Sequence, residues 1–171
     1  MKLTLLSTIA AAGLFSGCAA WNSESPQAGK EKLAPETFYL PDARGSQVVS
    51  VTNAGPAAAS IVVQTLAVAV KETGPKETVA HFKEVYAFSP AFIAVHRDEP
   101  TQLRFWNLQP DDNHDFMLYA PDRVFMKILL PPLKETSYVF TFHREGLFSF
   151  ICAMHQPAMA GQILVLPPES H

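Results

Sequence analysis

The chain has 171 residues, of which 48% are hydrophobic and 17% are charged. This balance is typical of a globular domain and excludes a chain that is disordered throughout. Lysine and arginine number 13 against 16 acidic residues, so the formal charge is -3, and the sequence lacks the basic surface that nucleic-acid binding requires. With 12 phenylalanines and 14 prolines, the composition favours short strands joined by irregular turns.

The N-terminus has the layout of a secretory signal peptide. Lys2 precedes an apolar run that is too short to span a bilayer comfortably, and small residues then lead to Cys18. The stretch "LFSGC" resembles a bacterial lipobox, which implies a signal peptide over residues 1–17 and a lipid on Cys18. The alternative is an ordinary signal that is cleaved after "CAA". Because Ala19 and not Asp follows the cysteine, the resemblance implies a periplasm-facing protein anchored in the outer rather than the inner membrane.

Residues 18–45 are polar and rich in proline, glycine and serine, which predicts a flexible, lipid-anchored linker. The globular domain is then expected over residues 46–171. Its first part, residues 46–77, contains two runs rich in β-branched residues that predict extra N-terminal strands, although the second run is also compatible with a short helix. Residues 77–88 follow a Gly-Pro turn and are expected to form the hairpin partner of that run.

The rest of the chain has a regular rhythm of short apolar runs, each bounded by Pro, Gly, Asp or Asn. No long helical periodicity interrupts it. The predicted strands are residues 91–95, 101–108, 115–120, 137–143, 147–152 and 161–167. Short strands at this spacing predict an all-β fold, an antiparallel sandwich or barrel.

Alternation within two of these runs predicts the interior face of the fold. Phe140 and Phe142 share one face of their strand, and Phe148, Phe150 and Cys152 share a face of the next. Cys152 is therefore expected at the end of a buried strand, where its side chain leaves the core and meets a loop.

Cysteine counting raises the probability of a metal at Cys152. The chain has two cysteines, and a lipid on Cys18 would leave Cys152 without a disulfide partner in an oxidising compartment. His155 follows in a C-x-x-H spacing, Met159 lies four residues further, and His114 begins a strand upstream. A thiolate, two imidazoles and a weak axial thioether form the ligand set of a blue copper site.

Other interpretations of these residues fit less well. The simplest is a buried thiol beside a chance histidine. Structural zinc draws on more cysteine and histidine ligands and rarely recruits methionine. A binuclear copper centre needs two cysteines in this loop, and a multicopper enzyme needs further histidine pairs. Two groups of side chains are interpreted as surface or packing residues: His81, His96, His143 and His171, and Met117, Met126 and Met154.

Residues 78–168 resemble the cupredoxin family. The resemblance rests on "FSP" (88–90), on "NHDF" (113–116) and on "EGLFSFICAMHQPAMAGQILV" (145–165). It implies a Greek-key β-sandwich with one type 1 copper ion.

Carried over position by position, the family pattern makes His114, Cys152, His155 and Met159 the copper ligands. Asp115 stands where the family often has asparagine, a side chain that ties the two ligand loops together. The charge of the aspartate would lower the reduction potential.

The resulting expectation is a monomeric one-electron carrier of the bacterial cell envelope, and not an enzyme. Met154, Pro157 and Ala158 would surround the exposed edge of His155 as a small apolar docking surface for a redox partner, a cytochrome or a membrane oxidoreductase. Two alternatives are a lipoprotein that stores copper or delivers it to a copper-accepting protein, and an accessory subunit of a membrane redox complex.

Overall fold

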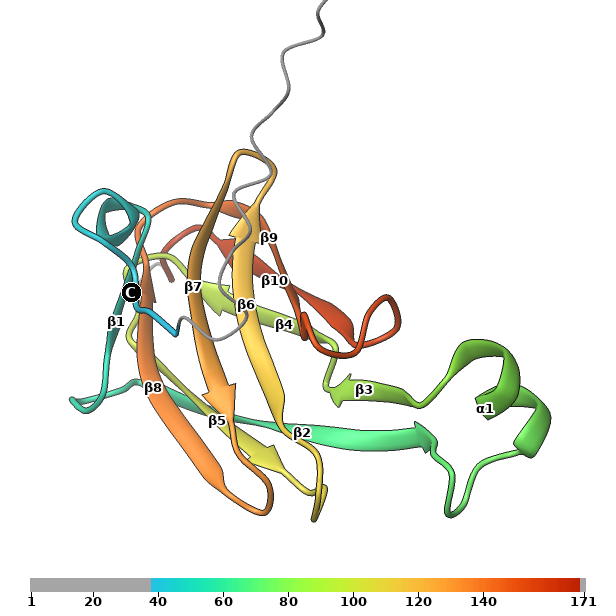
Figure 1. Cartoon of the computed structure of the whole chain (residues 1–171). Coiled ribbons are helices and arrows are strands. Elements are labelled where there is room, and N and C mark those ends of the chain that lie inside the picture. The colour runs from blue at the N-terminus through green and yellow to red at the C-terminus, as the bar shows by residue number, and fades with distance from the viewer. Residues whose placement is uncertain (1–37, 170–171) are drawn as a thin grey trace, which may run out of the picture. The chain divides into compact units, whose positions relative to one another are not determined.

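In the computed structural model, residues 38–169 are described. The predicted signal peptide, Cys18 and the first part of the predicted linker lie outside this range. Two five-stranded sheets face each other as a β-sandwich (Figure 1). The first sheet has the order β1 (Val49–Thr52), β8 (Glu135–Phe142), β5 (Thr101–Asn107), β2 (Ala59–Ala69) and β3 (Val85–Ser89). The second has the order β4 (Phe92–His96), β10 (Ala160–Leu166), β9 (Gly146–Ile151), β6 (His114–Ala120) and β7 (Arg123–Leu130).

Most strand pairs are antiparallel, as predicted, but each sheet also contains one parallel pair. β2 pairs with β5 and β10 pairs with β4 in parallel register. The predicted antiparallel pairing therefore holds for most strands but not for these two pairs, because their partners are set by tertiary contacts that local patterning does not record. The all-β class and the sandwich are confirmed.

The sandwich core is aromatic. Phe140, Phe142, Phe148, Phe150 and Cys152 are all 0–2% exposed, so the alternation that predicted their inward face is confirmed. Such a core holds the strand ends in fixed positions, because close-packed protein interiors leave little room for side chains to move.

Two elements differ from the predicted strands. Residues 77–88 were expected to be a strand throughout, but α1 (Lys76–Phe82) precedes β3. This helix begins directly after Pro75, whose fixed φ suits a helix start, and carries Glu77 in its first turn, where the helix dipole favours an acid. The second difference is β7, whose nearly continuous apolar sequence "RVFMKILL" was not predicted as a strand.

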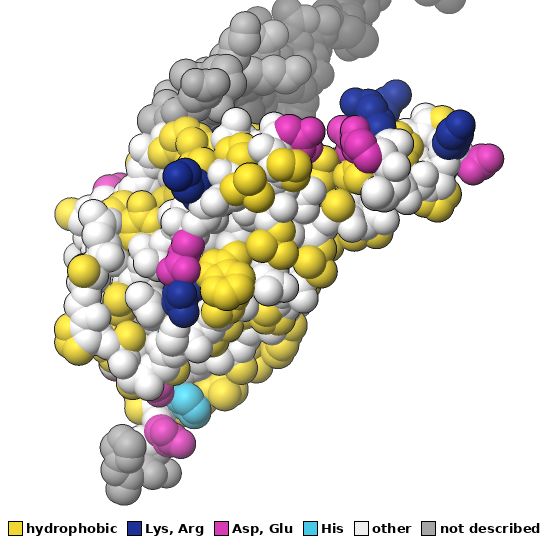
Figure 2. Space-filling view, turned by 90° about the horizontal axis from the view of Figure 1, so that it is seen from below, with side chains coloured by type: hydrophobic (Ala, Val, Ile, Leu, Met, Phe, Trp, Pro, Cys, Tyr) yellow, Lys and Arg dark blue, Asp and Glu magenta, His cyan; other side chains and the backbone are white. Residues whose placement is uncertain are grey.

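The β2–β3 region projects beyond the sandwich and carries α1 at its tip (Figure 1). Helix α1 has no buried residue, and charged side chains gather at this projecting end, whereas hydrophobic side chains cover much of the neighbouring face (Figure 2). β2 itself lies between β5 and β3. Residues 46–77 thus supply strands to the sheet and are not an appendage to it.

The start of the described chain packs on the second sheet. Tyr39 forms an antiparallel bridge with Lys127 of β7, and a short 3-10 helix, η1 (Gly45–Gln47), leads into β1. Residues 38–45, which the sequence assigns to the linker, therefore contact the domain. Within residues 38–169, no helix is long and apolar enough to span a membrane.

Candidate metal centre

Three of the predicted ligands, Cys152, His155 and Met159, lie in the tight loop that follows β9. The backbone N–H of Cys152 donates to the carbonyl oxygen of Met159 (2.9 Å), and the N–H of Met159 donates to the carbonyl oxygen of His155 (3.3 Å). These bonds close the loop on itself before the chain enters β10. The side chains of Cys152 and Met159 are fully buried, and His155 is half-buried.

His114 reaches the same place from the adjacent strand. β6 and β9 are antiparallel neighbours, with Met117 opposite Ile151, so the start of β6 faces the end of β9. His114 is the first residue of β6 and is completely buried. The sheet register therefore brings together two ligands that are far apart in sequence.

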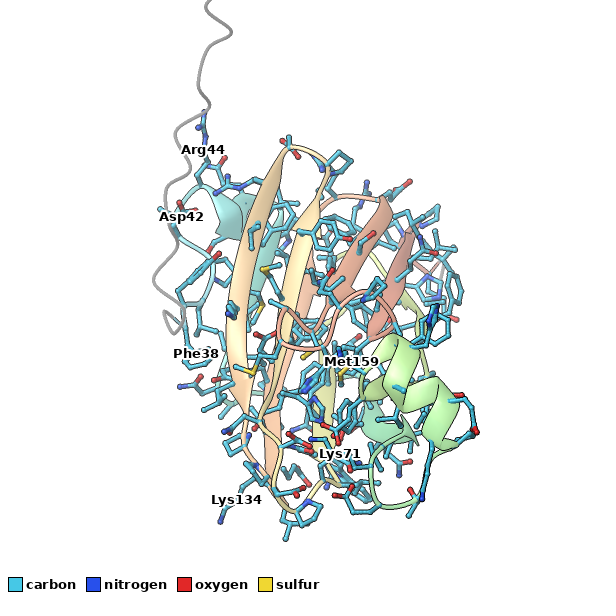
Figure 3. The ribbon with its side chains drawn as sticks, turned by 45° about the vertical axis from the view of Figure 1, so that its right-hand side comes forward. Phe38, Asp42, Arg44, Lys71, Lys134 and Met159 are labelled. Atoms are coloured by element: carbon cyan, nitrogen blue, oxygen red, sulfur yellow. The ribbon has the colours of Figure 1, made fainter. Side chains whose placement is uncertain are left out.

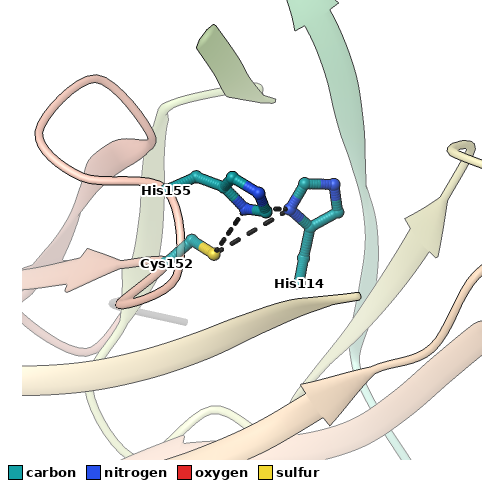
Figure 4. Close-up of side chains that lie close together, drawn as sticks. All are labelled: His114, Cys152 and His155. Carbon is teal, nitrogen blue, oxygen red and sulfur yellow. Dashed lines mark hydrogen bonds between the residues drawn. The ribbon is translucent and has the colours of Figure 1, made fainter. Parts of the chain in front are cut away.

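The donor atoms of His114, Cys152 and His155 surround a single point (Figure 4). Nδ1 of His114 lies 3.0 Å from Nδ1 of His155, and Sγ of Cys152 lies 3.9 Å and 3.6 Å from these two nitrogens. A point equidistant from all three atoms lies about 2 Å from each, close to the bond lengths of about 2.0 to 2.3 Å that nitrogen and sulfur ligands make to a first-row metal. The cluster could therefore hold a copper ion.

Burial keeps the two imidazoles in the form that binds metal. It lowers the pKa of His114 to about 4, with a further contribution from the neighbouring His155. Burial also lowers the pKa of His155. Both rings are thus neutral at pH 7, with lone pairs available for a metal. Nε2 of His114 has no hydrogen-bond partner among the described residues, and the Nδ1 atom faces the cluster.

The pKa of the Cys152 thiol is shifted upward, whereas the pKa values of the two histidines are shifted downward. Burial raises the pKa of Cys152, and the backbone N–H of Asp115, which donates to Sγ at 3.4 Å, opposes this rise. A metal cation at the cluster would deprotonate the thiol, since a coordinating thiol loses its proton outright.

Asp115 joins the two ligand-bearing segments, the role that the cupredoxin resemblance implies for this position. Its Oδ1 accepts a hydrogen bond of 2.6 Å from the backbone N–H of Ala153, the residue after Cys152. The side chain is completely buried. Its Oδ2 has no hydrogen-bond partner among the described residues, but the ammonium of Lys127 lies 3.2 Å away, an ion-pair distance.

Sequence reasoning missed two residues that contact this centre or its support. The buried ring of Tyr86 lies 4.8 Å from the ring of His114 and 4.5 Å from that of His155, and its hydroxyl donates to Asp112. Lys127 is the second. The alternation of Tyr86 with Phe88 in β3 could have indicated an inward tyrosine, and a single lysine within the apolar β7 could have indicated a paired charge.

The other predicted site residues lie around the loop. Met159 is buried where the loop returns to the sheet (Figure 3), and its role as a ligand stays a prediction. Met154, Pro157 and Ala158 are exposed beside His155. Cys18 lies outside the described residues.

Among the remaining histidines, none joins the cluster in the described part of the chain. His81 lies in α1. His143 is exposed and contacts Ser50 Oγ (3.0 Å) and Asp98 Oδ1 (2.8 Å), which fastens the edge strand β1 to the turn before β5.

The buried His114 predicts a pH dependence for the metal-free protein. The folded-state pKa is about 4, whereas an unfolded chain keeps the ordinary value near 6.5. Between these values the unfolded chain binds more protons, so the free energy of unfolding should fall as the pH falls from about 6.5 to about 4, by up to about 3 kcal/mol. Urea unfolding at several pH values measures this loss. The His114→Gln variant should lose less stability over the same range, and an equal loss in both proteins would contradict the prediction.

No family model and no curated protein sequence matches the chain. The solved structures that are similar to it include a multicopper oxidase, auracyanin B and auracyanin A. A multicopper oxidase is 15% identical with a TM-score of 0.50, over 66% of this chain and 45% of that chain. Auracyanin B is 14% identical with a TM-score of 0.48, over 71% and 99% of the two chains.

Auracyanin A, described as a "blue" copper protein from the green thermophilic photosynthetic bacterium Chloroflexus aurantiacus, is 16% identical with a TM-score of 0.44, over 63% and 98%. Of the three, only the match to the multicopper oxidase is close enough to identify the fold, and the aligned part spans less than half of that protein. Together with the two facing sheets and the loop that enters β10, it shows that this domain has the cupredoxin fold.

Proposed function

We propose that the domain is a one-electron carrier in which His114, Cys152, His155 and Met159 hold one type 1 copper ion. The observation that carries the proposal is the convergence of two imidazole nitrogens and one cysteine sulfur on a point about 2 Å from each, within first-row bond lengths. This donor set, with a methionine nearby, is that of blue-copper electron-transfer sites. Bound copper would supply one-electron chemistry between Cu(I) and Cu(II).

The protein's own contribution is to hold the donor atoms still. His114 and Cys152 lie at the ends of neighbouring strands whose inner faces pack into the phenylalanine core. The loop between Cys152 and Met159 is closed by backbone hydrogen bonds, and the ring of Tyr86 covers both imidazoles. Donor atoms fixed in this way would move little between the two oxidation states, which favours fast electron transfer.

We infer a carrier rather than an enzyme because four protein side chains would close the coordination sphere. Catalytic metal sites keep a position open for water or substrate. The exposed Met154, Pro157 and Ala158 beside the half-buried His155 would form a small apolar docking surface, suited to brief encounters with a redox partner such as a cytochrome or a membrane oxidoreductase. A lipid on Cys18 would hold the carrier at the cell envelope.

Copper storage or delivery is the second candidate function. The observation that favours it is Met154, which is 42% exposed next to the cluster, where a soft thioether could receive or release Cu(I). A delivery protein would bind Cu(I) tightly and transfer it to an acceptor, and it would not need a reversible potential.

A copper titration separates the two candidates. The full chain with Cys18→Ser, in which Cys152 is the remaining thiol, would be titrated with Cu(II) while the visible spectrum and the reduction potential are recorded. One equivalent of copper, an intense thiolate-to-copper band and a reversible potential are the results expected of a carrier. Tight Cu(I) binding without that band, with transfer to a Cu(I) chelator or acceptor, would refute the carrier and support delivery.

A further inference from the structure

A buried aspartate, Asp115, contacts the ligand loop of the candidate metal centre. Asp115 is 0% exposed. Its side chain accepts the Ala153 N–H (2.6 Å) and its backbone N–H donates to Cys152 Sγ (3.4 Å). One residue thus fastens β6 to the ligand loop through both its side chain and its main chain. An uncompensated negative charge at this position would be costly to bury and would favour the more positive state of a nearby metal.

Lys127 supplies the compensating charge from the neighbouring strand. In the β6–β7 pair, Asp115 lies opposite Leu129 and Met117 lies opposite Lys127, so Asp115 and Lys127 are diagonal neighbours on one face of the sheet. The Lys127 ammonium lies 3.2 Å from Asp115 Oδ2, and the lysine side chain is only 16% exposed. Because both partners are shielded from water, their attraction is screened far less than that of a surface pair.

The first described residues of the chain hold Lys127 in place. The backbone N–H of Tyr39 donates to the Lys127 carbonyl (2.8 Å), and the Lys127 N–H donates to the Tyr39 carbonyl (3.0 Å). The Phe38 ring lies 5.7 Å from the Lys127 ammonium, within the range of a cation–π contact. Figure 3 shows Phe38 at the outer side of the β6–β7 hairpin. The segment that leads out of the domain therefore covers the lysine.

We propose that Lys127 is a positioning residue that neutralises Asp115 and thereby sets the reduction potential of the metal centre, with Phe38 shielding the pair from water. The part of this inference that concerns the potential rests on the proposed function. Asp115 keeps the hydrogen bond that joins β6 to the ligand loop. Lys127 offsets the cost of burying a carboxylate where the family often has the neutral amide of asparagine. The pair also links the N-terminal segment to a metal ligand: Phe38 contacts Lys127, and Lys127 contacts Asp115. Asp115 in turn contacts Cys152.

The first test is a double-mutant cycle on the metal-free chain, which does not depend on copper. Lys127→Met and Asp115→Asn should each lower the urea midpoint of unfolding, because each leaves one buried charge without its partner. The double variant should be at least as stable as the Lys127→Met variant. Additive losses in the double variant would show that the two side chains act independently, which would overturn the pair.

The second test is the reduction potential of the copper-loaded chain. Lys127→Met should shift the potential downward, because the remaining carboxylate stabilises Cu(II) over Cu(I). Asp115→Asn should shift it upward, because the lysine charge then remains alone. Opposite signs are the decisive result. Variants that merely loosen the loop would shift the potential in the same direction, and that outcome, or no shift in either variant, would refute the proposal.

Two further variants complete the design. Phe38→Ala should shift the potential in the same direction as Lys127→Met but by less, since water would screen the ammonium. Arg104→Met breaks the exposed Arg104–Glu135 pair (2.8 Å) on the other sheet and should leave the potential unchanged. If the unsubstituted chain takes up no copper, the proposed function and the potential-setting role both fail. The metal-free cycle would still decide whether Lys127 and Asp115 stabilise the fold as a coupled pair.

Discussion

Replacing Cys152 by serine is expected to abolish the visible band of the copper-loaded protein and to weaken copper binding by at least about a hundredfold. Residues that only support a metal ligand are already worth about 10 to 100-fold in affinity, and Cys152 would be a ligand itself. A serine hydroxyl cannot supply the sulfur-to-copper charge transfer that gives the colour. Absorption spectroscopy and a competition titration against a copper chelator measure both effects.

Ala153→Ser is the matched control, because Ala153 lies in the same loop, its side chain is exposed, and the substitution keeps its backbone N–H. This variant should keep the band and the copper affinity of the unsubstituted chain. Colour that survives in the Cys152→Ser variant would show that the assigned ligand set is wrong. Loss of colour in both variants would point to general disruption of the loop and would not support a specific role for Cys152.

Replacing Phe150 by alanine is expected to destabilise the domain by about 3 to 5 kcal/mol, the usual cost of deleting a buried phenyl ring. Phe150 is 0% exposed, and its ring lies 5.3 Å from that of Phe88 and 5.2 Å from that of Phe116. The cavity would lie at the end of β9, the strand that leads directly into Cys152. We therefore expect the metal to dissociate faster as well. Urea unfolding of the metal-free chain and copper release to a chelator measure the two effects.

The control for Phe150 is Phe92→Ala in β4 of the same sheet. Phe92 is 55% exposed, so its removal should change the free energy of unfolding by less than about 1 kcal/mol. Equal losses from the two substitutions would contradict the assignment of Phe150 to a packed interior.

The sequence could predict those features that local patterning records. Alternation in the runs that became β8 and β9 identifies the inward phenylalanines and places Cys152 at the end of a buried strand. The spacing of Cys152, His155 and Met159 follows from one short loop, so these candidates can be recognised without a structure. His114 can be recognised from its position at the start of a predicted strand upstream of the loop.

The features that the sequence did not reveal depend on other parts of the chain. β7 was missed because its run of apolar residues has no clean alternation, and the β6–β7 register shifts between Leu118 and Tyr119. α1 was missed because Thr78 and Val79 are β-branched and favour a strand. Lys127 and Tyr86 acquire their roles only when β7 and β3 are placed beside the ligands, which is a tertiary event.

The strand order has a kinetic consequence. β1 pairs with β8, and β4 pairs with β10, so each sheet joins strands that are far apart in the sequence. Topologies dominated by such non-local pairing fold in milliseconds to seconds, since loop closure must precede the contacts that reward it. His114 meets the Cys152 loop only when β6 and β9 have paired. We therefore expect the chain to bind its metal after the sheets have formed. The metal would bind a folded domain and would not be needed to start folding.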